Sequence, residues 1–206
     1  PMSFRAPLQS LDLALAAAGL PDLLAGGYPD LDGETVSAVL ASAAAFTEAE
    51  LAPLNRDGDR IGARFENGVV KAAPGFAQAY KAFAAPRWNS LSSDMAYGGQ
   101  GLPKAMELAV FEMVHAANMA FGLCPMLTQG AIEALTLHGT ERQKRLVLPR
   151  LVSGDLHCCM ALTEPDAGSN SLAIRSFARP DGNKGWRLAG RKVWITGVVQ
   201  AEGQAP

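Results

Sequence analysis

Apolar positions in the first three quarters of the chain recur at the spacing of amphipathic helices. After Glu34 they fall three or four residues apart, at Val36, Val39, Leu40, Ala43 and Phe46. Apolar residues with this spacing share one face of a helix, and Asp32 can cap the first turn of this one. We expect the helix to end before Pro53, because a proline ring is incompatible with a helix interior.

Further helices are expected on both sides of this one. Their ranges are 8–24 with an interruption at Pro21, 75–84, 103–121, 125–138 and 140–150. Pro103 suits a first helical turn, and Thr140 with Gln143 has the spacing of a capping box. The polar, glycine-bearing stretch 55–68 is expected to be a loop. On the 103–121 helix, His115 and Met119 are expected to face the core.

The pattern changes near residue 155, after which short segments alternate in polarity or are rich in β-branched residues. Such segments are typical of strands, and the candidates are 156–163, 172–179, 185–189 and 192–196. The turn residues 181–183 suit a hairpin connection. The predicted fold class is therefore α+β. A helical domain over residues 1–155 precedes the start of an antiparallel β domain over residues 156–206, which is expected to pack against the helices.

Composition allows a buried core and excludes several kinds of function. The chain has 206 residues, of which 49% are apolar, and a net charge of −2. It therefore has no electrostatic footprint for nucleic acid and no apolar run long enough for a membrane span. We also expect no export, because the first residues lack a charged-then-apolar signal pattern. Its cysteines are odd in number, and Cys158 and Cys159 are adjacent on an expected strand, so their side chains diverge. We therefore expect no disulfide framework, and we expect a reducing, cytoplasmic location.

Residues 160–173 carry the most informative pattern, which reads Met-Ala-Leu-Thr-Glu-Pro-Asp-Ala-Gly-Ser-Asn-Ser-Leu-Ala. Free backbone N–H groups and short hydroxyls at the end of a strand, as at Thr163 and Ser169, suit an anionic or heteroaromatic ligand. Downstream, Trp194 offers an indole that can stack on a ring, and Thr196 offers a hydroxyl that can bond to it. Each residue alone also suits an ordinary turn or packing role. Their ordered combination favours ligand binding.

Together the two segments resemble the flavin-binding signature of the acyl-CoA dehydrogenases. Residues 139–154 resemble the stretch that precedes this signature, and residues 97–102 resemble the family's glycine loop before a long helix. Residues 118–129 are similar to one branch of the family, the 3-methylmercaptopropionyl-CoA dehydrogenase type. The chain departs from the pattern at Asn170, where the signature has aspartate, and beyond Gly197, where the match ends.

The resemblance implies a flavoprotein oxidoreductase of fatty acid metabolism that uses FAD to dehydrogenate an acyl-CoA thioester between its α and β carbons. A carboxylate removes the α proton while the β hydrogen leaves as hydride to flavin N5. The implied cofactor-binding residues are Met160, Leu162, Thr163, Gly168, Ser169, Trp194 and Thr196. An electron-transfer flavoprotein is the implied acceptor, and a homo-oligomer is implied for the full-length protein.

Among these residues the resemblance implies distinct roles. Thr163 and the backbone of Leu162 face the pyrimidine side of the flavin, and the hydroxyl of Thr196 approaches N5. Trp194 packs near the ring, and Ser169 meets the pyrophosphate region of a cofactor or of CoA.

The family's glutamate base belongs to a C-terminal helical bundle, and the chain is expected to be truncated before it. No catalytic residue is therefore assigned, and the 206-residue chain alone is expected to be inactive. Glu164 is interpreted as a structural hydrogen-bond acceptor. No metal site is expected near His157, because no second ligand pair has zinc spacing. The alternative function is a non-catalytic fragment or binding module, and a helical adaptor without cofactor would leave residues 160–173 unexplained.

Overall fold

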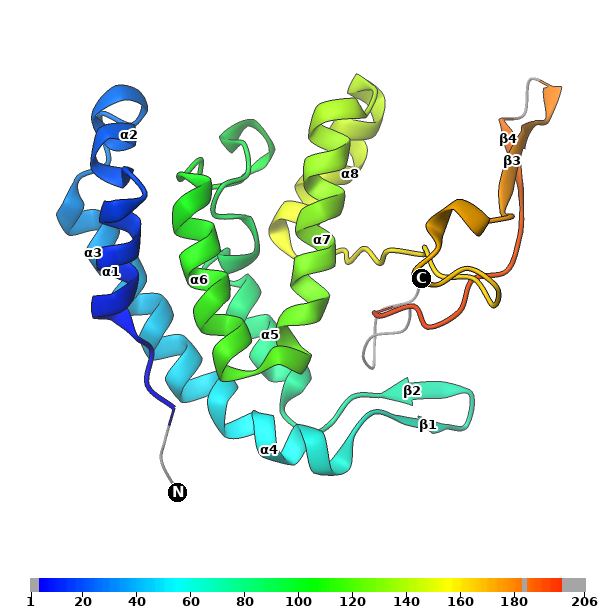
Figure 1. Ribbon diagram of the computed structural model, residues 1–206, viewed down its shortest axis with the longest axis horizontal. Coiled ribbons are helices and arrows are strands. Elements are labelled where there is room, and N and C mark those ends of the chain that lie inside the picture. The colour runs from blue at the N-terminus through cyan, green and yellow to red at the C-terminus, as the bar shows by residue number, and fades with distance from the viewer. Residues whose placement is uncertain (1–3, 183–184, 198–206) are drawn as a thin grey trace.

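The computed structural model describes residues 4–182 and 185–197, and most of these form helices that stand side by side (Figure 1). The α-helices are α1 (Leu8–Ala17), α2 (Leu20–Gly27), α3 (Gly33–Phe46), α4 (Ala52–Ile61), α5 (Phe76–Ala84), α6 (Lys104–Ala117), α7 (Met119–His138) and α8 (Glu141–Ser153). A π-helical turn, η1 (Thr47–Leu51), joins α3 to α4. The 3-10 turns are η2 (Trp88–Ser90), η3 (Met95–Tyr97) and η4 (Ser171–Ala173).

Two small antiparallel sheets accompany the helices. One pairs β1 (Arg64–Glu66) with β2 (Val69–Lys71), and the other pairs β3 (Phe177–Pro180) with β4 (Trp186–Ala189). In the second sheet the register runs from Phe177 opposite Ala189 to Pro180 opposite Trp186. The α+β class is confirmed, although the β1–β2 hairpin lies inside the part of the chain that was expected to be entirely helical.

The predicted helix caps are confirmed. They could be predicted because a cap depends only on residues that are close in the sequence. The Thr35 backbone N–H donates to Asp32 Oδ1 over 2.8 Å at the start of α3. At the start of α8, Thr140 and Gln143 form the reciprocal capping box. Each cap satisfies backbone N–H groups that have no partner within the first helical turn.

The helix α3 ends at Phe46, before Pro53 as predicted, but the chain does not leave the helical conformation there. Helical backbone continues through η1 into α4, and Pro53 lies in the first turn of α4. A proline is tolerated there because its missing N–H would have no standard helical partner, and the wider π turn rearranges the hydrogen bonds just before it. Residues 55–61, expected to be loop, are consequently helical.

The prediction of a single helix over 103–121 is wrong, because the helix breaks at Asn118. This buried side chain accepts a hydrogen bond from the Phe121 backbone N–H (3.0 Å) and donates one to the Leu51 carbonyl (3.2 Å). Asn118 therefore ends α6 and caps α7. Pro125 lies inside α7 rather than at its start, and Met119, expected in the core, is exposed.

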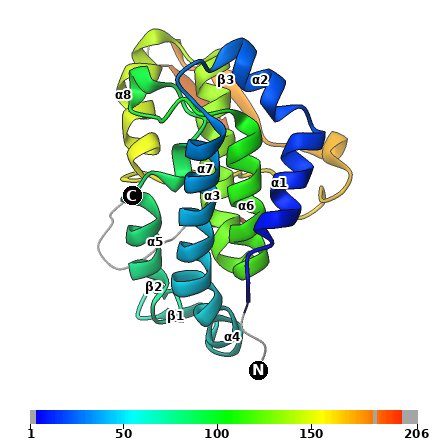
Figure 2. The same ribbon diagram turned by 90° about the vertical axis from the view of Figure 1, so that its left-hand side faces the viewer.

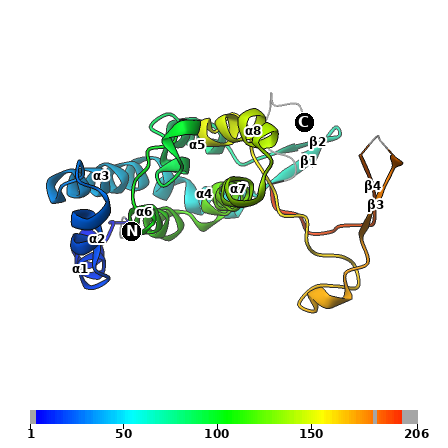
Figure 3. The same cartoon turned by 90° about the horizontal axis from the view of Figure 1, so that it is seen from above.

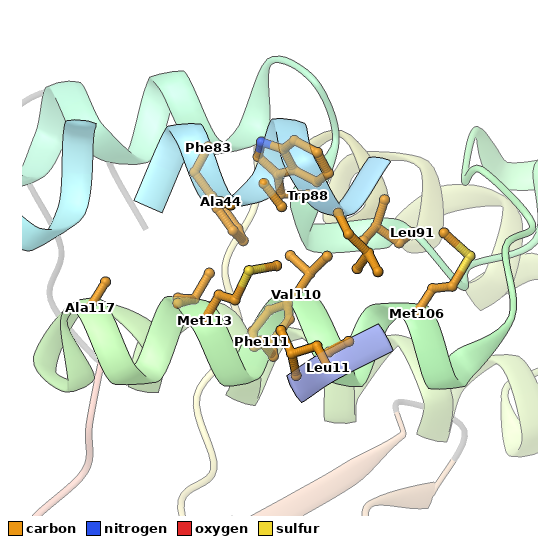
Figure 4. Close-up of a cluster of buried hydrophobic side chains, with 14 of the residues drawn as sticks. Leu11, Ala44, Phe83, Trp88, Leu91, Met106, Val110, Phe111, Met113 and Ala117 are labelled. Atoms are coloured by element: carbon orange, nitrogen blue, oxygen red, sulfur yellow. The ribbon is translucent and has the colours of Figure 1, made fainter. Parts of the chain in front are cut away.

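The core is built around α6, whose apolar face meets α1, α3, α5 and the η2 turn. Figure 4 shows Val110 and Met113 of α6 pointing toward Ala44 and Phe83, and Figure 2 shows α3 running along α6. The Phe83 side chain is fully buried. Its ring lies 6.1 Å from that of Phe46, 6.0 Å from Phe111 and 5.5 Å from Phe121.

The C-terminal segment differs from expectation in three ways. Residues 156–163 and 192–196 form no strand within the described residues, because a strand requires a ladder of hydrogen bonds to a neighbour. The strand expected at 172–179 is reduced to β3. The strands do not pack on the helices: every residue of β3 and β4 is exposed, and the hairpin projects away from the helices in Figures 1 and 3. Asn183 and the tail 198–206 lie outside the described residues.

No single helix in the described part of the chain is long and apolar enough to cross a membrane. Only α1 and α2 taken together, with a 65° bend between them, satisfy length and composition criteria.

We expect Phe83→Ala to lower the free energy of unfolding by about 3–5 kcal/mol, the range for truncating a buried phenylalanine. Urea denaturation followed by circular dichroism at 222 nm measures the change. Phe65→Ala is the matched control, because the same ring is 75% exposed in β1, and it should change stability by no more than about 0.5 kcal/mol. Equal effects of the two substitutions would contradict a core centred on Phe83.

Candidate functional site

The candidate site begins where the chain leaves α8 and is anchored to the helices. The Leu156 N–H donates to the Arg150 carbonyl (3.0 Å), and the Cys158 N–H donates to Thr128 Oγ1 (3.2 Å). The His157 ring lies 4.3 Å from that of Tyr80. Burial lowers the pKa of His157, which favours a neutral imidazole in this apolar contact. These contacts fix the direction in which residues 159–163 leave the helices.

The two motifs that the sequence singled out lie side by side. The Val193 backbone N–H donates to the Thr163 carbonyl over 3.0 Å. The Lys192 ammonium donates to the Leu162 carbonyl over 2.9 Å. Segments separated by about thirty residues in sequence are thus joined by two hydrogen bonds, one from the backbone and one from a charged side chain.

Glu164 connects these two segments to a third. Its carboxylate accepts hydrogen bonds from the backbone N–H groups of Arg175 (2.8 Å) and Ser176 (2.9 Å) and from the Lys192 ammonium (2.9 Å). The Ser176 side chain, then the Arg175 N–H and the Lys192 ammonium, lower the pKa of Glu164 to about 2, because each donor favours the ionised form. The expectation that Glu164 is a structural acceptor is confirmed.

A tight turn follows directly and positions Gly168 and Ser169. The backbone groups of Glu164 and Ala167 bond to each other in both directions, at 3.0 and 3.1 Å. Gly168 and Ser169 leave this turn exposed to solvent. Asp166, at the tip of the turn, is also exposed.

Most of the predicted cofactor-binding residues are exposed to solvent. Met160, Leu162, Trp194 and Thr196 are exposed, and Thr163 is partly buried. Within the described ranges, the hydroxyls of Thr163, Ser169 and Thr196 make no hydrogen bond to another protein group. The Trp194 indole is 90% exposed and its backbone is left-handed, with φ of 58°. Such a conformation is uncommon for a bulky residue and marks candidate functional positions.

No metal centre forms in this region among the described residues. Glu164 is fully engaged by its three donors, and no group of three or more His, Cys, Asp or Glu side chains there could hold a metal ion. A shallow hollow of about 250 Å³ lies beside the 164–167 turn, and none of the seven predicted cofactor-binding residues lines it. The hollow is lined by Glu164, Pro165, Asp166, Arg175, Ser176, Phe177, Ala189, Gly190 and Arg191.

Sequence reasoning missed the part that Lys192 plays in this region. The lysine was recognised only as the start of the segment containing Trp194. Its ammonium contacts both Leu162 and Glu164. The available signal was that one motif contains an acidic residue and the other a basic residue, which can form an ion pair.

Comparison with known proteins identifies the fold. The model of the family described as "Acyl-CoA dehydrogenase, N-terminal domain" matches residues 33–155. The chain belongs to the acyl-CoA dehydrogenase family. It is 38% identical over 197 residues, or 95% of its length, to 3-methylmercaptopropionyl-CoA dehydrogenase of Ruegeria pomeroyi, in agreement with the branch that residues 118–129 resemble.

Solved structures give the same result. A glutaryl-CoA dehydrogenase from Mycobacterium smegmatis in complex with FADH2 superposes with a TM-score of 0.65 at 26% identity, over 80% of this chain and 39% of that one. An acyl-CoA dehydrogenase from Bacillus anthracis complexed with FAD has a TM-score of 0.64 at 25% identity, over 82% of this chain and 28% of that one. The chain spans only 34% of the Ruegeria relative, so it corresponds to the N-terminal part of the family fold.

We expect acid to release Glu164 from its donors. Its folded pKa, about 2, lies below the ordinary value of 4.5, so ionised Glu164 stabilises the joined segments above about pH 4.5 and this stabilisation is lost as pH falls toward 2. Amide ¹H–¹⁵N resonances of Arg175 and Ser176 should shift with a midpoint near pH 2. In Glu164→Gln this titration should disappear, whereas a wild-type midpoint near 4.5 would show that the donors are absent in solution.

Proposed function

We propose that this chain carries the first part of the FAD site of an acyl-CoA dehydrogenase. The observation that supports this most directly is the pairing of residues 162–163 with residues 192–193 through two hydrogen bonds. The paired segments include Thr163 and lead directly into the exposed indole of Trp194. A flavin ring needs a flat apolar surface together with polar groups around its edge, and both are present.

Individual residues would contribute in the following ways. Thr163 and the backbone of Leu162 would bond to the pyrimidine side of the ring, and the Thr196 hydroxyl would lie near N5. Trp194 would cover part of the ring and exclude water from it. Ser169, beside Gly168, would meet the phosphates, and Met160 would supply apolar contact. When bound, FAD supplies the acceptor for a hydride.

For the whole protein we propose α,β-dehydrogenation of an acyl-CoA thioester. The name of the Ruegeria relative, a 3-methylmercaptopropionyl-CoA dehydrogenase, supports a thioester substrate, and the matched structures in complex with FADH2 and FAD support the cofactor. An electron-transfer flavoprotein as acceptor, a homo-oligomeric full-length protein and a cytoplasmic location complete the proposal. The proposed division places a helical domain at residues 1–155 and the β domain from residue 156.

The alternative is that the 206 residues act as a non-catalytic binding module. Its support is the openness of the region, because all residues of β3 and β4 are exposed and Trp194 is nearly fully so. A flavin held on such a surface would remain in contact with water. The first proposal assigns catalysis to the whole protein, whereas the alternative concerns the 206-residue chain and includes no catalysis. Each proposal has its own measurement.

Titration of FAD into the chain, followed by flavin fluorescence and absorbance, tests the cofactor proposal. We expect Trp194→Ala to weaken binding by roughly 5- to 30-fold, a typical loss for one aromatic contact with a ring, and Thr163→Val to weaken it by a smaller factor. Trp186→Ala is the matched control, since that indole is also exposed but lies on β4. Equal affinity for wild type, Trp194→Ala and Trp186→Ala would refute the assignment.

Dye reduction with short, medium and long acyl-CoA substrates and added FAD tests whether the chain is catalytic by itself. We expect no turnover, because the carboxylate base that the family resemblance implies belongs to a C-terminal helical bundle outside the N-terminal part that the chain spans, and loss of a general base costs on the order of 10²–10⁴ in rate. Turnover within about tenfold of a typical ~10 per second would show that a base is present. Heat-denatured chain with FAD serves as the blank.

A further inference from the structure

Lys192 and Val193 donate hydrogen bonds to the backbone carbonyls of the 162–163 segment in the candidate site. Lys192 donates to the Leu162 carbonyl, and Val193 donates to the Thr163 carbonyl. Both carbonyl oxygens of the 162–163 segment are therefore used within the protein. The backbone N–H groups of Leu162 and Thr163 make no hydrogen bond within the described ranges. The segment thus presents two unpaired backbone donors, whereas each of its carbonyl oxygens already accepts one hydrogen bond from within the protein.

Unpaired backbone donors suit a particular kind of ligand. The pyrimidine end of an oxidised flavin carries two carbonyl oxygens and a ring nitrogen, N1, that accept hydrogen bonds, beside one ring N–H that donates. Free backbone N–H groups can meet those acceptors directly.

Glu164 makes this arrangement possible because it holds the lysine. A carboxylate has about four acceptor positions, and here it satisfies two backbone N–H groups and the Lys192 ammonium together. The side chains are largely removed from water, with 7% of Glu164 and 25% of Lys192 exposed. Removing one partner would leave the other without its main counterpart, which is costly at a partly buried position.

We propose that Glu164 and Lys192 are positioning residues for the flavin, acting by joining residues 162–164 to residues 192–193 and leaving a donor edge for the pyrimidine ring. This inference rests on the proposed FAD function. Neither side chain is assigned a contact with the cofactor. Their effect on affinity passes through Leu162, Thr163 and the segment that carries Trp194.

The test compares Glu164→Gln and Lys192→Met with matched neighbours. Asp166→Asn removes an exposed carboxylate two residues from Glu164, and Arg191→Met removes an exposed cation beside Lys192. Lys192→Arg keeps the charge and tests for rescue. Each variant is measured in two ways, by amide hydrogen exchange without cofactor and by FAD titration, with the melting temperature of the helices as a check on folding.

We expect Glu164→Gln and Lys192→Met to speed exchange at Val193 by roughly tenfold or more and to weaken FAD binding by roughly 5- to 100-fold, the range for losing hydrogen bonds to a charged group. Glu164→Gln should also expose the N–H groups of Arg175 and Ser176. Helix melting should be unchanged, the two control variants should behave as wild type, and Lys192→Arg should recover part of the affinity.

Two results would overturn the inference. Unchanged exchange at Val193 in both variants would show that the pair does not join the segments. Faster exchange with wild-type FAD affinity would show that the pair is structural only. A wild-type chain without FAD affinity would instead refute the cofactor proposal, and the exchange data would still decide whether the pair holds the two segments together.

Discussion

Burial of the Phe83 ring is the interaction on which the helical part of the molecule depends. Rings from α3, α6 and α7 surround it at 5.5–6.1 Å, so α5 is locked into the layer from several directions. The residues that follow α5 then hold the end of α8: the Asn89 amide donates to the carbonyls of Leu151 (3.1 Å) and Val152 (2.9 Å). Tyr80 on α5 also bonds to the Gly154 carbonyl. Apolar packing in the core thereby determines where the chain leaves the helices.

Beyond that exit point the physical basis of the structure changes. Residues 159–197 bury few side chains, among them Glu164 and Ala167, so the hydrophobic effect contributes little to their arrangement. Charge-assisted hydrogen bonds centred on Glu164 and Lys192 hold the three segments together instead. Such bonds are stronger than those between neutral groups and are directional. They can set the position of a backbone edge without an apolar core beneath it.

The contrast between an apolar helical core and a C-terminal segment held by hydrogen bonds suits the part of the family fold that the chain contains. The helical layer is complete enough to bury a core, and it matches the family model over residues 33–155. The candidate cofactor region is joined to the layer through the anchored residues 156–158. Large apolar side chains in this region, such as Leu172 and Trp194, remain exposed to solvent.

The sequence by itself determined the features that depend on neighbouring residues or on an ordered motif. The caps at Asp32 and Thr140, the α+β class and the family followed from local spacing and residue type. The order of the signature and the segment around Trp194 predicted a shared binding role, which stays a prediction.

Tertiary structure alone decided where helices continue or break and which extended segments become strands. Asn118 ends α6 because its side chain reaches Leu51, sixty-seven residues away, a contact invisible to local spacing. Pro53 and Pro125 remain within helical segments because one missing N–H can be offset by packing and by rearranged hydrogen bonds. Residues 156–163 have strand-like composition but no ladder partner among the described residues, and strand formation requires one.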